Sequence, residues 1–314
     1  MRIAIFGVGA VGSYFGGRLA ETGEDVAFIA RGENLRVLRD KGLRVDSIKG
    51  DFIVKPVEAT DDPSEVGVVD VVLVSVKAWQ IPEAAQAMRP MVGPETFVVP
   101  LQNGVEAPGQ LAAILGPAHV LGGLCGLISF TVGPAHICHA GADPFVQFGE
   151  LDNKPSERAG HLRQVFQDSV GVEPSIPSDI HAAMWQKFLL IASWGGVGAV
   201  TRAPIGILRR QPETSGMLEG TMKEVADVAR SRNVALAPNV VSKTMQFVDG
   251  LPEHGTASMQ RDIAEGRPSE LSNLNGAVVR FGWESGIDTP MNAFIYHSLL
   301  PLERRARGQI DFEL

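Results

Sequence analysis

Apolar residues follow two different periods along the chain, and the change from one to the other divides the sequence. Over residues 1–177, apolar runs of strand length alternate with segments in which apolar positions recur every three or four residues, as in amphipathic helices. The run at 68–76 is almost entirely β-branched, which is typical of a parallel strand covered on both faces. From residue 178 onward the pattern is helical. It predicts an α/β domain with a mostly parallel sheet over residues 1–177, followed by an all-α domain over residues 178–314.

The same pattern sets the expected elements. Strands are predicted at 2–6, 25–30, 68–76 and 96–100, with an irregular β region at 43–60, short strands at 127–132 and 145–148 that add antiparallel to the sheet, and a short strand or linker at 172–177. Helices are predicted at 34–41, 83–88, 105–115, 157–168, 213–231, 239–247, 269–283 and 292–307. A long helical segment also begins after Ser178 or Asp179, and we expect Gly195, Gly196 and Gly198 to loosen it.

A glycine-rich turn follows the first strand. Gly7, Gly9 and Gly12 form the pattern GxGxxG between an apolar strand and a helical segment. Gly7 permits the tight turn, Gly9 lets a pyrophosphate approach the backbone, and Gly12 lets the helix pack closely on its strand. The N-terminus of that helix favours a negative charge. We therefore expect a dinucleotide to bind along this turn, at Gly7, Val8, Gly9, Ala10, Val11 and Gly12.

The end of the second strand indicates which dinucleotide binds. NAD sites usually carry Asp or Glu there to bond the ribose hydroxyls, whereas this strand ends in Ile29, Ala30 and Arg31. The planar fork of an arginine suits the 2′-phosphate of NADP(H). The alternative is that Arg31 is an ordinary solvated loop residue. We predict that the cofactor is NADPH/NADP+.

Composition and charge narrow the class of protein. The chain has 314 residues, of which 45% are hydrophobic and 20% charged, as expected for a globular protein of two domains. A net charge of −8 argues against a nucleic-acid surface. We interpret the one basic cluster, residues 303–307, as a solvated helix end. No apolar stretch is long enough to span a membrane.

The cysteines indicate a reducing compartment and no metal site. The only two, Cys125 and Cys138, do not form a CxxC pair. His136 and His139 flank Cys138, but side chains alternate between the faces of a strand, so the three cannot readily converge on one metal ion. We expect a cytoplasmic protein without a bound metal.

Polar side chains stand at places where a site would need them. Lys77 and Asn103 follow two predicted parallel strands, whose carboxyl ends border the ligand crevice of such a sheet. Lys187 lies in an apolar helix, where a lysine either reaches water or is buried with a partner. Capping and turn roles are the structural alternatives. Three more candidates, each also open to a capping role, lie in the Gly- and Pro-rich stretch 254–276: Ser258, Asp262 and Glu270.

Taken together, these motifs resemble those of the ketopantoate reductase family, the 2-dehydropantoate 2-reductases. The resemblance rests on GVGAVGSYFGGRL, IARG, VKAWQ, QNG, MWQKF and SMQRDI in this order, and it spans almost the whole chain. It implies a Rossmann domain, a helical C-terminal domain for substrate binding and dimerisation, and NADPH-dependent reduction of a 2-oxo acid between them.

The resemblance also implies a role for each candidate residue. The lysine of the WxK motif, Lys187, corresponds to the general acid, and Glu270 to the glutamate that binds substrate and supports that acid. The remaining assignments place Lys77 and Asn103 beside the nicotinamide and the substrate, Arg31 at the 2′-phosphate, and Ser258 at the substrate carboxylate.

The chain departs from the family pattern at three positions. Ile191, Gly195 and Gly255 stand where family members usually carry asparagines that bond the substrate. An unpaired polar substrate group costs roughly 1–3 kcal/mol. The sequence therefore indicates the class of reaction more strongly than it indicates the substrate.

Several hypotheses for the function remain open. The leading one is reduction of ketopantoate to pantoate in pantothenate (coenzyme A) biosynthesis. The alternatives are reduction of a larger or more apolar 2-oxo acid, a dehydrogenase of the opine or 3-hydroxyisobutyrate type, and a non-catalytic NADPH-binding regulator. The expected partner is a small-molecule 2-oxo acid, with no nucleic acid and no membrane. The sequence leaves homodimerisation open.

The cofactor prediction can be tested at Arg31. Replacing Arg31 with Asp should weaken NADPH binding far more than NADH binding, because only NADPH carries the 2′-phosphate. Titration of the variant with both nucleotides measures the difference. An equal loss for both would exclude the proposed role of Arg31.

Overall fold

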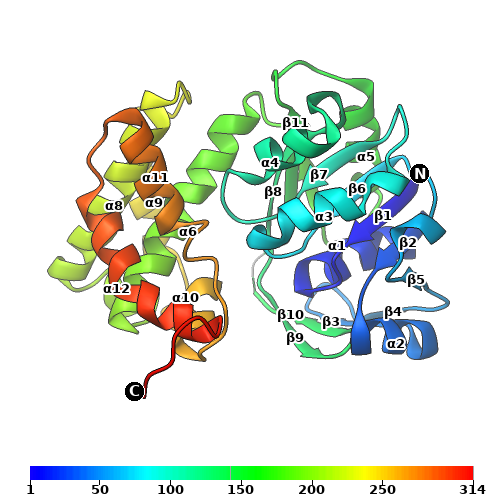
Figure 1. The fold of residues 1–314 in the computed structure, drawn as a ribbon, viewed down its shortest axis with the longest axis horizontal. Coiled ribbons are helices and arrows are strands. Elements are labelled where there is room, and N and C mark those ends of the chain that lie inside the picture. Colours follow the sequence, from blue (N-terminus) through cyan, green and yellow to red (C-terminus); the bar gives the residue numbers. More distant parts are fainter. Residues whose placement is uncertain (142, 314) are drawn as a thin grey trace. The chain divides into compact units, whose positions relative to one another are not determined.

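The chain forms two compact units. The computed structural model describes residues 1–141 and 143–313 (Figure 1). The first unit contains residues 1–102 and 106–180, and the second contains residues 103–105 and everything described from 181 onward. The predicted division lies at 177/178, and the three-residue segment 103–105 is the part of the N-terminal half that groups with the second unit.

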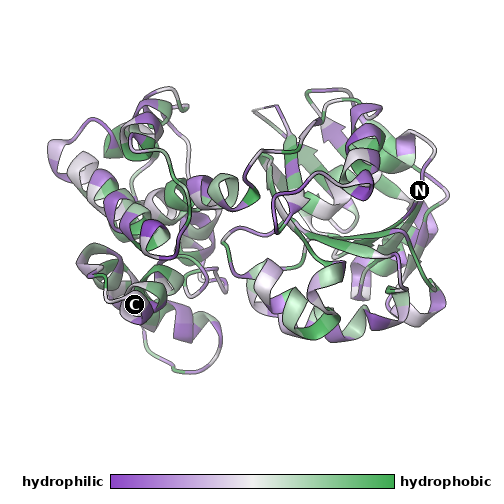
Figure 2. Cartoon of the chain, turned by 90° about the horizontal axis from the view of Figure 1, so that it is seen from above, coloured by the Kyte–Doolittle hydropathy of each residue, from purple (hydrophilic) through white to green (hydrophobic). Residues whose placement is uncertain are grey.

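A parallel sheet forms the centre of the first unit. Its five strands are adjacent in the order β5-β2-β1-β6-β7, and every adjacent pair is parallel. The strands are β1 (Arg2–Phe6), β2 (Asp25–Ile29), β5 (Glu58–Thr60), β6 (Val71–Val74) and β7 (Phe97–Pro100). Their residues are mostly hydrophobic, as Figure 2 shows in green.

Both faces of this sheet are buried. Ile3 and Ile5 of β1 pack in one hydrophobic core, whereas Ala4 and Phe6 pack in another. This follows from the alternation of side chains along a strand. Helices α1, α2 and α5 contribute to the first core, and α3 and α4 to the second. These helices are α1 (Ala10–Glu21), α2 (Gly32–Lys41), α3 (Ile81–Ala87), α4 (Ala107–Leu115) and α5 (Glu157–Gln167).

The predicted antiparallel additions to the main sheet are wrong. The later strands instead form two separate sheets of mixed pairing, in the orders β4-β3-β10-β9 and β12-β11-β8. The pattern missed β8, because its glycines hide the strand signal. The strands are β3 (Leu43–Ser47), β4 (Phe52–Val54), β8 (Leu121–Gly126), β9 (Ser129–Gly133), β10 (His136–His139), β11 (Phe145–Glu150) and β12 (Glu173–Ser175).

The second unit is helical throughout its described residues, so the predicted α/β domain followed by an all-α domain is confirmed. Four short 3₁₀ helices lie in the first unit: η1 (Pro63–Glu65), η2 (Ala78–Gln80), η3 (Arg89–Met91) and η4 (Pro117–His119). The remaining helices are α6 (Ile180–Thr201), α7 (Ile205–Leu208), α8 (Pro212–Ser231), α9 (Val240–Asp249), α10 (Ser258–Ala264), α11 (Asn275–Ser285) and α12 (Pro290–Ala306). Among the residues the structure describes, none of these helices is long and apolar enough to cross a membrane.

The glycines of α6 do not loosen the helix, contrary to the prediction. A Cβ atom on Gly196 would lie 2.7 Å from the side-chain amide of Asn275, and one on Gly198 would lie 2.5 Å from Gln260 Oε1. The missing side chains therefore let two other segments pack directly on α6. The helix runs without interruption to Thr201.

Two further predictions in this unit are wrong. The segment 269–274 is a turn, and the helix predicted to begin there begins at Asn275. The cluster 303–307 is not solvated throughout, because Glu303 is only 2% exposed and accepts hydrogen bonds from Ser269 of that segment. In sequence, a buried charged residue near a helix end looks the same as a solvated one. Only its long-range contacts show the difference.

Two glycines of the GxGxxG turn should respond differently to substitution. A Cβ on Gly12 would lie 2.1 Å from the carbonyl oxygen of Gly7, whereas the space around Gly9 is open. We expect Gly12→Ala to lower the free energy of unfolding by about 1–3 kcal/mol or more. Gly9→Ala should lower the free energy of unfolding by less than about 1 kcal/mol, because it only replaces glycine at the N-cap with alanine, which is less favourable there. Thermal unfolding of both variants without ligand checks this, and equal melting temperatures would contradict it.

Candidate functional site

The glycine turn is locked onto the loop that follows β6. Gly7 has a φ of +104°, which glycine adopts without strain, and its amide donates to Ile29 O at 3.1 Å. Ser75 Oγ donates to Gly7 O at 2.6 Å, and a Cβ on Gly7 would lie 2.8 Å from Val76 N. The sequence motifs do not point to Ser75, because a serine after a strand carries no signal of its own.

The start of α1 is suited to a phosphate group. Gly9 is the N-cap of α1 and makes no side-chain cap, and nothing lies within 4 Å of the position that its Cβ would occupy. The first N–H groups of a helix lack intrahelical partners, and the helix dipole favours an anion there. The open backbone at Gly9, Ala10 and Val11 therefore fits the pyrophosphate of a dinucleotide.

Arg31 is the N-cap of α2, directly after β2. Its guanidinium donates to Glu83 Oε1 at 3.2–3.3 Å, and the two side chains are 66% and 68% exposed. An exposed pair of this kind contributes only about 0–1 kcal/mol. Arg31 can therefore exchange the carboxylate for a phosphate at little cost.

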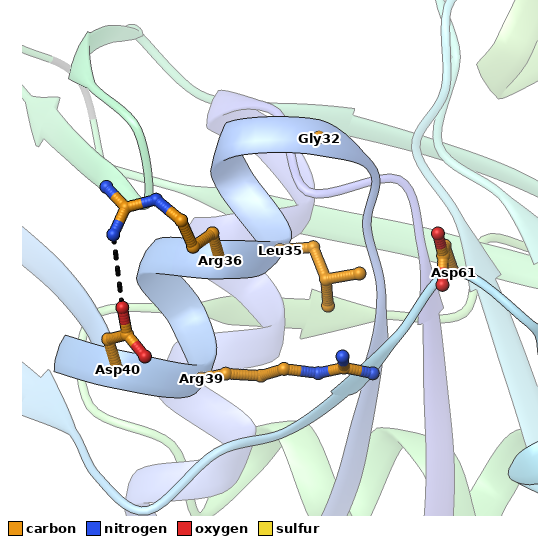
Figure 3. Close-up of a pocket in the computed structure, with 6 residues that line it drawn as sticks. All are labelled: Gly32, Leu35, Arg36, Arg39, Asp40 and Asp61. Carbon is orange, nitrogen blue, oxygen red and sulfur yellow. Dashed lines mark hydrogen bonds and ion pairs between the residues drawn. The ribbon is translucent and has the colours of Figure 1, made fainter.

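A cavity of about 320 Å³ lies beside α2 (Figure 3). Its lining residues are Gly32, Leu35, Arg36, Arg39, Asp40 and Asp61. Both arginines already have partners: Arg36 pairs with Glu33 and Asp40, and Arg39 Nε donates to Ala59 O at 2.9 Å. The hydrogen bond from Arg36 holds the pKa of Glu33 below its usual value. With two aspartates also in the lining, the cavity does not extend the predicted phosphate site.

Lys77 is exposed and lies at the carboxyl end of β6. It is the N-cap of η2, and its Nζ lies 5.8 Å from the centre of the Trp79 ring. The backbone just before Lys77 is held by Gln102, which follows β7. Gln102 Nε2 donates to Val74 O at 2.9 Å and to Val76 O at 3.0 Å. The end of β6 is thereby fixed from both sides, by the glycine turn and by Gln102.

Asn103 and Glu270 meet within the second unit. Asn103 Nδ2 donates to Glu270 Oε2 at 3.3 Å, although 167 positions separate the two residues. Glu270 is 6% exposed, and Asn103 is half-buried. Asn103 follows the carboxyl end of β7, as predicted, and the structure groups it with the helical unit. The structure brings these two predicted site residues together.

Lys187 is half-buried near the middle of α6 in the same unit. Met184, Trp185 and Phe188 beside it in sequence are buried. Ile191 and Gly195 follow it by one and two turns, on the same side of the helix. A Cβ on Gly195 would lie 3.2 Å from Met259 Cε, so a methionine approaches α6 here. The helix face that carries Lys187 is therefore apolar.

The other two candidates of the second unit lie in α10. Ser258 is exposed at the first position of the helix. Asp262 is 9% exposed and accepts from Arg267 Nε at 3.1 Å and Nη2 at 2.8 Å, which fixes the turn after α10. Asp262 is thus explained by a structural role, and Ser258 stays a candidate.

Comparisons with known proteins identify the family. The model of the family described as ketopantoate reductase PanE/ApbA matches residues 3–153, and the model of its C-terminal domain matches residues 179–303. An uncharacterised oxidoreductase of Bacillus subtilis is 28% identical over 95% of this chain and 98% of its own. A 2-dehydropantoate 2-reductase of a Nostoc species is 29% identical over 99% of this chain and 98% of its own.

A solved structure supports the same conclusion. The crystal structure of a ketopantoate reductase from Ralstonia eutropha is 31% identical, covers 98% of this chain and 100% of its own, and superposes with a TM-score of 0.88. The family that the sequence motifs indicated is thereby confirmed. With its parallel sheet, its glycine turn and its helical second unit, the chain belongs to the ketopantoate reductase PanE/ApbA family of NADP-dependent oxidoreductases.

Proposed function

We propose that this protein reduces ketopantoate (2-dehydropantoate) to pantoate with NADPH, as a step of pantothenate biosynthesis. The proposal rests chiefly on the contact between Asn103 and Glu270, at 3.3 Å. Two residues that the family resemblance places at the substrate are adjacent in the same unit. An amide and a carboxylate side by side offer both a donor and an acceptor to a substrate with oxo, carboxylate and hydroxyl groups.

The proposed chemistry needs a proton donor beside the substrate. Bound NADPH would supply the hydride for the 2-oxo carbon. Lys187 gives the proton to the oxygen of that carbonyl, and its ammonium stabilises the negative charge that develops there. Glu270 orients the substrate hydroxyl or Lys187 itself. Ser258, exposed at the start of α10, binds the substrate carboxylate.

The two phosphate-binding parts of the cofactor site are assigned to the first unit. The backbone from Gly7 to Gly12 binds the pyrophosphate, Arg31 releases Glu83 to bind the 2′-phosphate, and Lys77 lies beside the nicotinamide together with Asn103. The open space at Gly9 and the exposed Arg31–Glu83 pair support this assignment. Residues 1–177 would then be the NADP-binding domain and residues 178–314 the domain for substrate binding and dimerisation.

A second candidate is an NADPH-dependent reductase of a more apolar 2-oxo acid. It is favoured by the apolar side of α6 beyond Lys187, where Ile191 and Gly195 replace two asparagines and Met259 approaches the helix. An apolar substrate side chain would leave fewer polar groups unpaired on that surface than the hydroxyl of ketopantoate.

The cellular setting also stays a prediction. Cys125 and Cys138 are not joined in a disulfide, in line with the proposed reducing cytoplasm. Dimerisation of the helical domain is checked by the mass of the protein in solution.

The role of Lys187 can be tested by removing its charge. Lys187→Met should lower kcat by about 10²–10⁴-fold, the usual contribution of a positioned acid, while NADPH binding is unchanged. The neighbouring exposed residue gives a matched control, since Gln186→Met alters the same helix without removing a charge. Near-normal turnover by Lys187→Met would show that another group is the acid.

The substrate is tested by NADPH consumption with a panel of 2-oxo acids. We expect the highest kcat/KM for ketopantoate, compared with straight-chain, branched and aryl 2-oxo acids. A preference for the apolar acids would favour the second candidate. NADPH binding without turnover of any acid would favour a regulator.

A further inference from the structure

A buried carboxylate lies behind the turn that carries Glu270. Glu303 of α12 is 2% exposed, and Ser269, the residue before Glu270, is fully buried. The amide of Ser269 donates to both carboxylate oxygens of Glu303, at 3.0 and 3.2 Å, and Ser269 Oγ donates to Oε2 at 2.5 Å. Neither Glu303 nor Ser269 is part of the proposed reaction.

Arg307 completes this cluster. Its Nε donates to Glu303 Oε1 at 2.6 Å, and its Nη2 donates to Ser269 O at 2.9 Å. The N–H, the C=O and the hydroxyl of Ser269 are therefore all bonded to the end of α12. We call Ser269, Glu303 and Arg307 the Ser269 brace.

The brace fixes the turn on which Glu270 lies. Ser269 Oγ accepts from Leu271 N at 3.2 Å, so the brace extends to the residue after Glu270. On the other side, Glu270 O accepts from Asn273 N at 3.0 Å and from Leu274 N at 2.9 Å. The backbone of Glu270 is held from both directions, and its carboxylate accepts a hydrogen bond from Asn103.

A buried carboxylate is a costly way to hold a helix end, and here Glu303 is 2% exposed while its partner Arg307 is only half-buried. Removing a charge from water costs several kcal/mol, and an apolar replacement is often as stable. Charged hydrogen bonds in a fixed geometry do, however, define a backbone position closely. The arrangement therefore indicates that the brace serves to fix the backbone position of residue 270, beyond any contribution to stability.

We propose that Glu303 and Arg307 are positioning residues for Glu270, acting through Ser269. This inference rests on the proposed function, because it requires Glu270 to act in the reduction. Loss of the brace lets the turn shift, so that Glu270 is displaced from the substrate while NADPH binding by the first unit is unaffected.

The same helix offers a matched control at its other end. Glu224 accepts from the amides of Met291 and Asn292, at 2.7 and 2.9 Å, and from Asn292 Nδ2 at 2.7 Å. It is a carboxylate that holds the start of α12 and bonds no atom of the brace in these contacts. Glu224→Gln therefore reports the effect of loosening α12 alone.

The experiment is a double-mutant cycle in the full-length protein. Glu303→Gln and Glu224→Gln are each made in the wild-type and in the Glu270→Gln background. Each protein is measured for kcat and KM with ketopantoate or the best acid of the panel, for NADPH affinity, and for melting temperature. Ser269→Ala, which removes only the hydroxyl bonds, is made in parallel in case Glu303→Gln does not fold.

We expect Glu303→Gln to lower kcat by about 10-fold or more in the wild-type background and by less than twofold in the Glu270→Gln background. Ser269→Ala should follow the same pattern with a smaller effect. Glu224→Gln should lower the melting temperature and change kcat by less than twofold in both backgrounds. NADPH affinity should stay the same throughout.

Two results would overturn the inference in different ways. If Glu303→Gln and Ser269→Ala lower kcat equally in both backgrounds, or lower only the melting temperature, the brace is merely structural and the proposed function stands. If Glu270→Gln itself leaves kcat unchanged, or if the wild type reduces no 2-oxo acid, the proposed function fails and the inference fails with it.

Discussion

The burial of the parallel sheet on both faces is the constraint on which the first unit depends. Ile3 and Ile5 enter one core and Ala4 and Phe6 the other, so the strands themselves offer no surface for a polar ligand. Polar chemistry is confined to the places where strands end. Ser75, which follows β6, bonds the glycine turn, and Gln102, which follows β7, bonds the end of β6. The close packing that excludes water from the sheet also fixes the backbone that a dinucleotide would meet.

The helical unit differs, because it holds isolated polar side chains within an apolar interior. Close packing at glycines and a buried carboxylate keep these side chains in place. Glycines in α6 bring α10 and α11 close, and the Ser269 brace bonds the start of the turn that carries Glu270 to the end of α12. The segment before Glu270 is thus held by Glu303, which lies 34 positions after Ser269 along the chain.

The sequence predicts local features well and long-range ones poorly. The alternating and helical periods identify the parallel sheet and the helical half, and the spacing of Gly7, Gly9 and Gly12 identifies the turn. The predicted helix at 269–283 begins too early, because the apolar positions of the turn that holds Glu270 mimic a helical period. From the sequence, Glu303 is predicted to be part of a solvated charged segment, because its partner Ser269 is 34 residues away. The site residues Lys187, Ser258 and Arg31 stay predictions.

The place of Asn103 has a consequence for how such a chain can be divided. Asn103 lies between β7 and α4 in sequence, yet it belongs with the helical unit through its bond to Glu270. A cut at 177/178 would leave the two partners on separate fragments. The halves therefore cannot be exchanged with those of a relative as independent modules: a chimaera inherits its asparagine from one parent and its glutamate from the other, and the two must still match.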